Sequence, residues 1–249
     1  MDGATLTPQG VFEEYELLAA YNRRLNLYDT VERNENFYIG RQWEGVRAPE
    51  LDKPVVNVLR RVIGYFIATI VSDDIALDVR PLGEGGAGAG ALGEIVRGAL
   101  EEAMEQSQFR PLCREVVRNA AVDGDGCLYL RFEPDEKSGG CVELEVVDNT
   151  DVLFGNVRLW QVQKQPYVIL VTRRRLDAVR REALAFAGEE EAAKVAPDAE
   201  RPERDGAPDE AVTVLLRLWK QDGRVWAAKF CRDAVVRPPA DTGLTLYPL

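Results

Sequence analysis

The chain has 249 residues, of which 46% are hydrophobic and 29% are charged. This length fits one large domain or two small ones, and the composition is that of an ordinary globular protein. The formal net charge of −11 excludes a protein that grips nucleic acid with its whole surface, although it leaves room for a local basic patch.

The sequence offers little to catalysis. It contains no histidine, which excludes Ser-His-Asp and Cys-His chemistry and leaves only carboxylate or lysine chemistry open. Adjacent carboxylates such as Glu101 and Glu102 point apart on a helix. The four cysteines lack zinc-like spacing and are expected to be reduced. We therefore expect no catalytic residue, no cofactor and no metal site, and the chain is predicted not to be an enzyme.

The most apolar stretch, Val62 to Val71, has ten residues, whereas a membrane-spanning helix needs roughly 20. The N-terminus lacks the basic segment and apolar run of a signal peptide. The sequence thus predicts a buried helix at this stretch, no membrane association and synthesis in the cytoplasm.

Apolar residues recur at helical spacing over 11–29, and Thr7-Pro8 is typical of a helix start. A second helix is expected over 30–42, ending near Gly40 or Gly45.

A third, apolar helix is expected over 54–71, with Asp52 as its N-cap and Pro54 in its first turn. Alternating apolar residues predict a strand at 74–81. The glycine-rich run 83–90 lacks the Gly-Lys-Ser/Thr of a phosphate loop and is interpreted as a linker.

Helices are predicted over 91–107 and 109–121. The Asp-Gly-Asp-Gly run that follows fails as a calcium loop, because Leu128 and Pro134 stand where glycine and glutamate are needed. It is better read as a turn into a hairpin of strands 127–132 and 141–147.

The C-terminal half alternates strands with one helix. Strands are predicted at 152–154 and 166–172, and a helix at 176–186. An acidic, proline-bearing linker is expected over 188–210. Asp222-Gly223 lies between two alternating runs, 212–219 and 224–230, and predicts a hairpin.

An aromatic, glycine and Gln-Trp segment at 34–43 precedes Pro49, the run Lys53 to Asn57 and the apolar helix. This order resembles the N-terminal part of tailed-phage portal proteins, which connect the phage head to the tail. The resemblance is best at residues 30–75, and the order of later elements also fits. Its motif residues, interpreted as structural, are Asn36, Tyr38, Gly40, Gln42, Trp43 and Asn57.

The resemblance implies an α+β fold. An N-terminal helical wing with a small antiparallel sheet would cover 1–165. A projecting stem helix and acidic linker would cover 166–210, and a clip-like β-hairpin would cover 211–249. The second stem helix, tunnel loop and crown of portal proteins would lie beyond Leu249, so the chain is expected to be truncated.

The resemblance also implies a function. Portal subunits form a typically dodecameric ring at one vertex of the capsid, through which double-stranded DNA is packaged and ejected. Implied partners are identical subunits, the terminase motor, head–tail adaptors and capsid proteins, and the implied location is the virion of a phage or prophage. The motor ATPase is a separate protein, which agrees with the missing phosphate loop.

Basic residues concentrate between 158 and 181. They are interpreted either as contacts to the phosphates of passing DNA or as ion-pairing residues at a subunit boundary. The candidate residues are Arg173, Arg174, Arg175, Arg180 and Arg181.

Two other functions stay open. One is a non-enzymatic phage adaptor or interaction module that uses the edge of the hairpin at 211–236. The other is a carboxylate- or metal-dependent hydrolase, although no spacing of acidic residues predicts its site.

Overall fold

A computed structural model describes residues 6–71, 78–80, 88–133, 140–198 and 211–249. The structure combines helices with antiparallel sheets, so the fold is α+β as the sequence predicted. The chain divides into two compact units, one formed by residues 1–28 with 150–248 and the other by residues 29–149.

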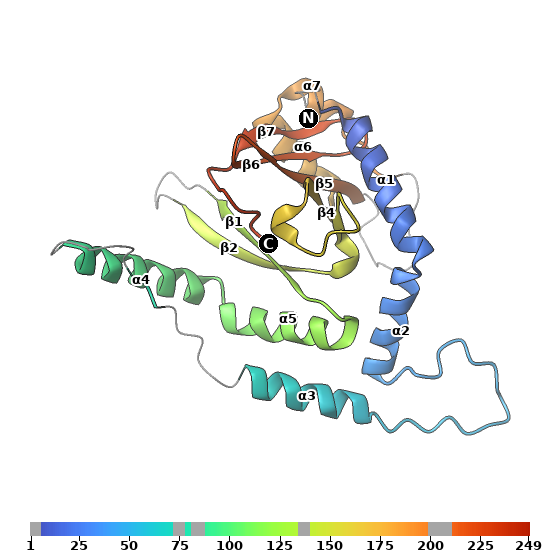
Figure 1. Ribbon diagram of the computed structural model, residues 1–249. Coiled ribbons are helices and arrows are strands. Elements are labelled where there is room, and N and C mark those ends of the chain that lie inside the picture. The colour runs from blue at the N-terminus through green and yellow to red at the C-terminus, as the bar shows by residue number, and fades with distance from the viewer. Residues whose placement is uncertain (1–5, 72–77, 81–87, 134–139, 199–210) are drawn as a thin grey trace. The chain divides into compact units, whose positions relative to one another are not determined.

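The first unit is built on a five-stranded antiparallel sheet in the order β3–β4–β5–β6–β7 (Figure 1). Asp222 and Gly223 have φ angles of 52° and 76° in the turn between β5 and β6, which confirms the predicted hairpin. The strands span β3 Val152–Phe154, β4 Tyr167–Arg175, β5 Ala211–Gln221, β6 Arg224–Phe230 and β7 Val235–Asp241.

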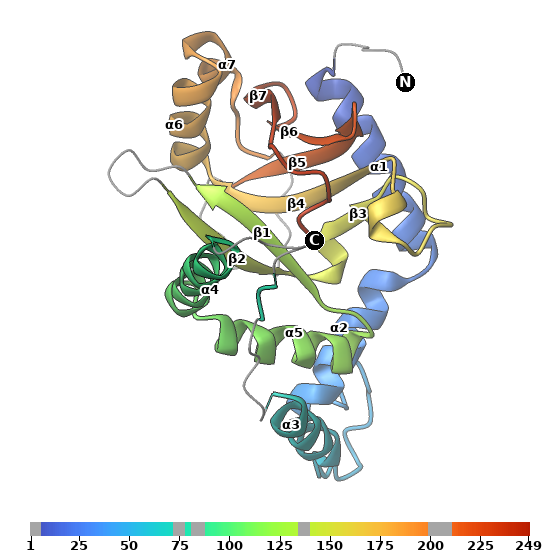
Figure 2. The ribbon, with the colours of Figure 1, turned by 60° about the vertical axis from the view of Figure 1, so that its left-hand side comes forward.

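Helix α1 (Pro8–Arg24) lies beside this sheet (Figures 1 and 2). Thr7 caps it, because the Thr7 hydroxyl oxygen accepts a hydrogen bond of 3.2 Å from the Gly10 amide. This confirms the predicted start. Farther along, Glu14 forms a two-pronged ion pair of 2.8 and 3.1 Å with the buried Arg217 of β5, which ties the helix to the sheet.

The alternation of β5 places two cores on opposite faces of the sheet. Leu215 packs with Val11 of α1 in one buried cluster. Val212 and Val214, which point the other way, pack with helix α6 (Leu176–Phe186) in a second cluster.

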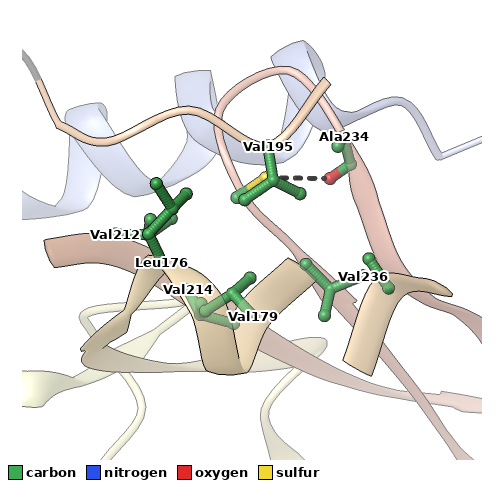
Figure 3. Packing of buried hydrophobic residues seen from close by; sticks show 9 residues of the cluster. Leu176, Val179, Val195, Val212, Val214, Ala234 and Val236 are labelled. Carbon is green, nitrogen blue, oxygen red and sulfur yellow. Dashed lines mark hydrogen bonds between the residues drawn. The ribbon is translucent and has the colours of Figure 1, made fainter. Parts of the chain in front are cut away.

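Helix α6 has the predicted bounds but not the predicted role. A stem helix should project without intrachain partners, whereas Leu176, Val179 and Ala183 of α6 are buried against β5 and β7 (Figure 3). The expectation of a projecting stem was therefore wrong. Helical periodicity shows which side of a helix is apolar but does not show what covers that side.

Two features of the C-terminal half differ from expectation. The stretch predicted as a linker contains a short helix, α7 (Glu189–Lys194), which lies against α6 (Figure 2); residues 199–210 lie outside the described residues. Strand β7 was not predicted, because Pro238 and Pro239 interrupt its strand pattern. Prolines are tolerated there since β7 is an edge strand.

The second unit is mostly helical, with a two-stranded antiparallel hairpin whose register pairs Cys127 with Val147. The two helices after the glycine-rich run and this hairpin were predicted. The elements are α2 Leu27–Ile39, which begins just before the unit, α3 Val58–Ile70, α4 Gly88–Gln106, α5 Phe109–Asp123, β1 Cys127–Glu133 and β2 Cys141–Val147.

Helix α3 starts four residues later than predicted, and Asn57 rather than Asp52 is its N-cap. The Pro54 carbonyl is held by side chains of the preceding loop, and Val55 and Val56 favour extended backbone. The α2 bounds lie three residues before the predicted ones. Most of the expected strand 74–81 and most of the glycine-rich run lie outside the described residues, and 78–80 form no strand.

The predicted domain boundaries do not coincide with the two units. The five-stranded sheet takes strands from all three predicted segments, 1–165, 166–210 and 211–249, and the hairpin of the predicted clip-like region lies inside that sheet.

Candidate functional site

The motif residues form one hydrogen-bonded joint between α2 and α3. After α2 the chain turns at Gly40, and Trp43 donates its indole N–H to the Pro54 carbonyl at 3.0 Å. Gln42 donates to the same oxygen at 3.3 Å. These bonds close the loop 40–54 at its two ends, so the helices meet at a fixed point.

Asn57 occupies the centre of this joint, half-buried. Its Oδ1 accepts from the Arg60 amide at 3.0 Å and caps α3, while its Nδ2 donates to the Tyr38 carbonyl at 2.7 Å. Gly40 has a φ of +88°, and a Cβ there would lie 3.3 Å from Asn57 Nδ2. Glycine therefore provides both the left-handed backbone and the space for the asparagine.

Replacing Asn57 with alanine is expected to destabilise residues 29–149 by about 2 kcal/mol, because one cap and one half-buried hydrogen bond are lost together. Asn57→Asp is the matched control, since it keeps the capping oxygen and loses only the donor to Tyr38; its effect should be intermediate. Amide exchange in the first turn of α3 and urea unfolding measure both. Equal protection of the Arg60 amide in Asn57→Ala and wild type would contradict this role.

Further contacts surround the joint, and they involve the remaining motif residue, Asn36, and several residues that were not predicted. The Asn36 carbonyl accepts from the Arg41 amide at 2.7 Å, and Lys53 Nζ donates to the Val46 carbonyl at 2.7 Å. Arg118 of α5 pairs with Glu35 of α2, and its guanidinium lies 4.9 Å from the centre of the Tyr38 ring. Long-range pairs of this kind, separated by over eighty residues, leave no periodic signal in the sequence.

A hollow of about 450 Å³ opens beside this joint, lined by Val55, Val56, Asn57, Arg60 and Arg61. In the first unit, an apolar hollow of about 210 Å³ lies between α1 and β3. Neither lining contains a carboxylate.

The five candidate arginines all bond to groups of their own chain. Four face carboxylates: Arg173 meets Asp198 at 3.5 Å, Arg174 meets Glu182, and both Arg175 and Arg181 meet Asp177 at 3.1 and 3.6 Å. Arg180 donates to the Val195 carbonyl at 2.9 and 3.1 Å. Much of the basic charge is therefore offset within the chain, and contact with DNA or with a neighbouring subunit stays a prediction.

Glu182 on α6 forms ion pairs with three basic side chains. Its buried carboxylate accepts from Lys229 Nζ at 2.8 Å, from Arg237 Nε at 2.5 Å and from Arg174. Burial alone would raise the pKa of Glu182, but the hydrogen bonds and charges of these cations outweigh it and lower the pKa to about 2. Burial lowers the pKa of Lys229, and the two neighbouring arginines lower it further, against the pull of Glu182.

Acid is expected to remove roughly 2 kcal/mol of stability through Glu182, after discounting for solvent screening. A carboxyl group whose folded pKa is depressed stabilises the fold above its unfolded pKa of about 4.3. That stability is lost as the pH falls through the folded pKa of about 2. Urea midpoints measured at several pH values should fall more steeply below pH 4 in wild type than in Glu182→Gln; parallel curves would contradict the assignment.

The described residues contain neither a metal-binding cluster nor a membrane-spanning helix. No group of three or more cysteine, aspartate or glutamate side chains there is arranged to hold a metal ion. None of the helices in the described ranges combines the length and apolar character that crossing a bilayer requires.

Comparison with protein-family models finds no match for this chain, and comparison with curated proteins finds no significant match. The resemblance to portal proteins therefore stays a prediction that no relative tests.

Proposed function

We propose that this chain is a subunit of a tailed-phage or prophage portal ring, a non-enzymatic assembly protein. The observation that carries the proposal is an uneven distribution of buried apolar side chains. Among the described residues, Val147 alone of 29–149 belongs to the buried hydrophobic set, whereas the first unit has two well-packed clusters. The described apolar side chains of residues 29–149 are therefore largely exposed, and an exposed apolar surface is typical of a binding interface. In most soluble oligomers the partner is an identical copy related by closed symmetry.

The joint at 36–57 supports the portal assignment in particular. The resemblance is carried by residues scattered over about twenty positions. Four of these residues share one joint, because Asn57 bonds to the Tyr38 carbonyl and both Gln42 and Trp43 bond to the Pro54 carbonyl. A set of residues with one shared structural role is what a family motif would be expected to preserve. The proposal keeps this joint and gives up the stem role of α6.

In this proposal the partners are identical subunits, double-stranded DNA in the channel, the terminase motor, head–tail adaptors and capsid proteins. The ring acts by geometry at the capsid vertex, because symmetry repeats one subunit surface around a central axis. The net charge of −11 suits a channel that lets DNA slide, since each phosphate contact adds adhesion.

Native mass spectrometry and negative-stain electron microscopy of the purified full-length protein test this proposal. Closed rings with a central hole, of one size and with copy numbers near twelve, are the expected result. A species that stays monomeric at tens of micromolar, where apolar interfaces of this kind associate, would overturn it.

A second candidate, the non-enzymatic adaptor or interaction module, is favoured by one observation. The C-terminal hairpin packs onto the N-terminal helix, since Leu215 and Phe230 share a cluster with Val11 of α1. The proposed binding edge is not available, because β5 and β6 are both interior strands of the sheet. A folded monomer in the ring experiment would support this candidate.

A further inference from the structure

Helix α3 was predicted to be buried, but none of its residues is buried and an apolar stripe lies on its surface. Val58, Val62, Tyr65 and Phe66 recur at i, i+4, i+7 and i+8 and are 46–72% exposed. This spacing places them on one side of the helix. The side that carries Ile63 and Ile67 is half-buried, and α3 lies against α5. A second helix could therefore pack on the exposed stripe.

Helix α4 has a stripe of the same kind. Leu92, Ile95, Val96 and Leu100 follow the i, i+3, i+4, i+8 spacing and are 38–68% exposed. Helix α4 lies against α5 and β2 within its unit, and these contacts leave the stripe uncovered.

The two helices differ in the sign of their charge. The charged residues of α3 are two arginines, Arg60 and Arg61, whereas α4 has four glutamates and one arginine. Two α3 helices that met face to face would bring arginines together, and two α4 helices would bring glutamates together. Only the pairing of α3 with α4 joins apolar stripes and opposite charges at once.

We infer that α3 of one copy docks on α4 of a second copy, an inference that rests on the proposed assembly function. Arg61 borders the α3 stripe, three residues after Val58 and four before Tyr65. Glu102 borders the α4 stripe, seven residues after Ile95, so the two charges meet at the rim. Such a contact uses different surfaces on the two copies, and a head-to-tail contact is the kind that closes into a ring.

The test reverses the rim charges and measures assembly by native mass spectrometry and light scattering. Arg61→Glu and Glu102→Arg are each expected to weaken assembly at least about ten-fold. The double variant R61E/E102R should restore assembly. An equimolar mixture of the two single variants should also assemble, because every junction in an alternating ring then joins opposite charges.

Two control variants lie on the same helices but away from the stripes. Arg60→Glu and Glu105→Arg change the net charge by the same amounts and should leave assembly unchanged, since helical geometry turns both residues to the opposite side. Circular dichroism of each variant shows that it is folded.

The outcomes separate this inference from the proposed function. If the wild type forms rings and both single variants still form them, the α3–α4 contact is wrong and the proposed ring stands. The same conclusion follows if the single variants lose assembly and neither the double variant nor the mixture regains it. A monomeric wild type would overturn the proposed function and this inference together. If the protein stays monomeric and the charge reversals change only its stability, both are overturned as well, because α3 and α4 would then pair within one copy.

Discussion

Replacing Glu182 with glutamine is expected to destabilise the unit formed by residues 1–28 and 150–248 by about 3 kcal/mol. The glutamine side chain keeps the size but removes the negative charge that Arg174, Lys229 and Arg237 share. Three cations would then repel one another at a site that is largely removed from water. The cost lies at the lower end of the range for a broken buried pair, because the two arginines are about one-third exposed.

Glu190→Gln is the matched control. Glu190 belongs to the neighbouring helix α7, is 87% exposed and pairs with Lys194 four residues away. Exposed pairs of this type contribute about 0.5 kcal/mol or less. Urea unfolding of the two variants should therefore give a large shift of the midpoint for Glu182→Gln and almost none for Glu190→Gln. Similar shifts in both would contradict the ionic role of Glu182.

The Glu182 cluster also explains why α6 does not project. The partners of this one carboxylate come from β4, β6 and β7, so the polar part of α6 is bonded to three strands. The apolar part, with Val179 at its centre, is fully buried against the same sheet (Figure 3). The charged and the apolar contacts of the helix thus both hold it to its own chain.

Local signals predicted most element positions. The Thr7-Pro8 start, the Asp222-Gly223 turn and the bounds of α6 depend on backbone preferences of a few neighbouring residues. Features set by distant partners were not predicted. Helix α3 begins late because Trp43 and Gln42 hold the Pro54 carbonyl, and no local pattern shows this.

The candidate site also has parts that could be predicted from the sequence and parts that could not. The motif residues were selected through a resemblance, and the structure brings most of them into one joint. The Glu35–Arg118 pair was missed because its members are 83 positions apart. The sequence showed that basic residues are concentrated around the five candidate arginines, but it did not show their ion-pair partners. Two of these partners, Asp198 and Glu182, lie outside the basic stretch or at its border.

Replacing Phe230 with alanine is expected to destabilise the same unit by about 4 kcal/mol. Phe230 has no exposed surface and lies in the cluster that joins β5 and β6 to α1. Removal of its ring takes away a large buried apolar area and leaves a cavity that Leu215 and Ile169, themselves fully buried in well-packed strands, cannot fill. The α1 helix, which meets the sheet through this cluster, should exchange its amide hydrogens faster.

Phe132→Ala removes the same side chain from β1 of the other unit, where Phe132 is 59% exposed. It should cost less than about 1 kcal/mol, because most of that ring already contacts water. Urea unfolding followed by circular dichroism gives both values, and amide exchange reports on α1. If Phe230→Ala unfolded the sheet without changing exchange in α1, the helix would not depend on this core. The joining of residues 1–28 to 150–248 would then rest on the Glu14–Arg217 ion pair instead.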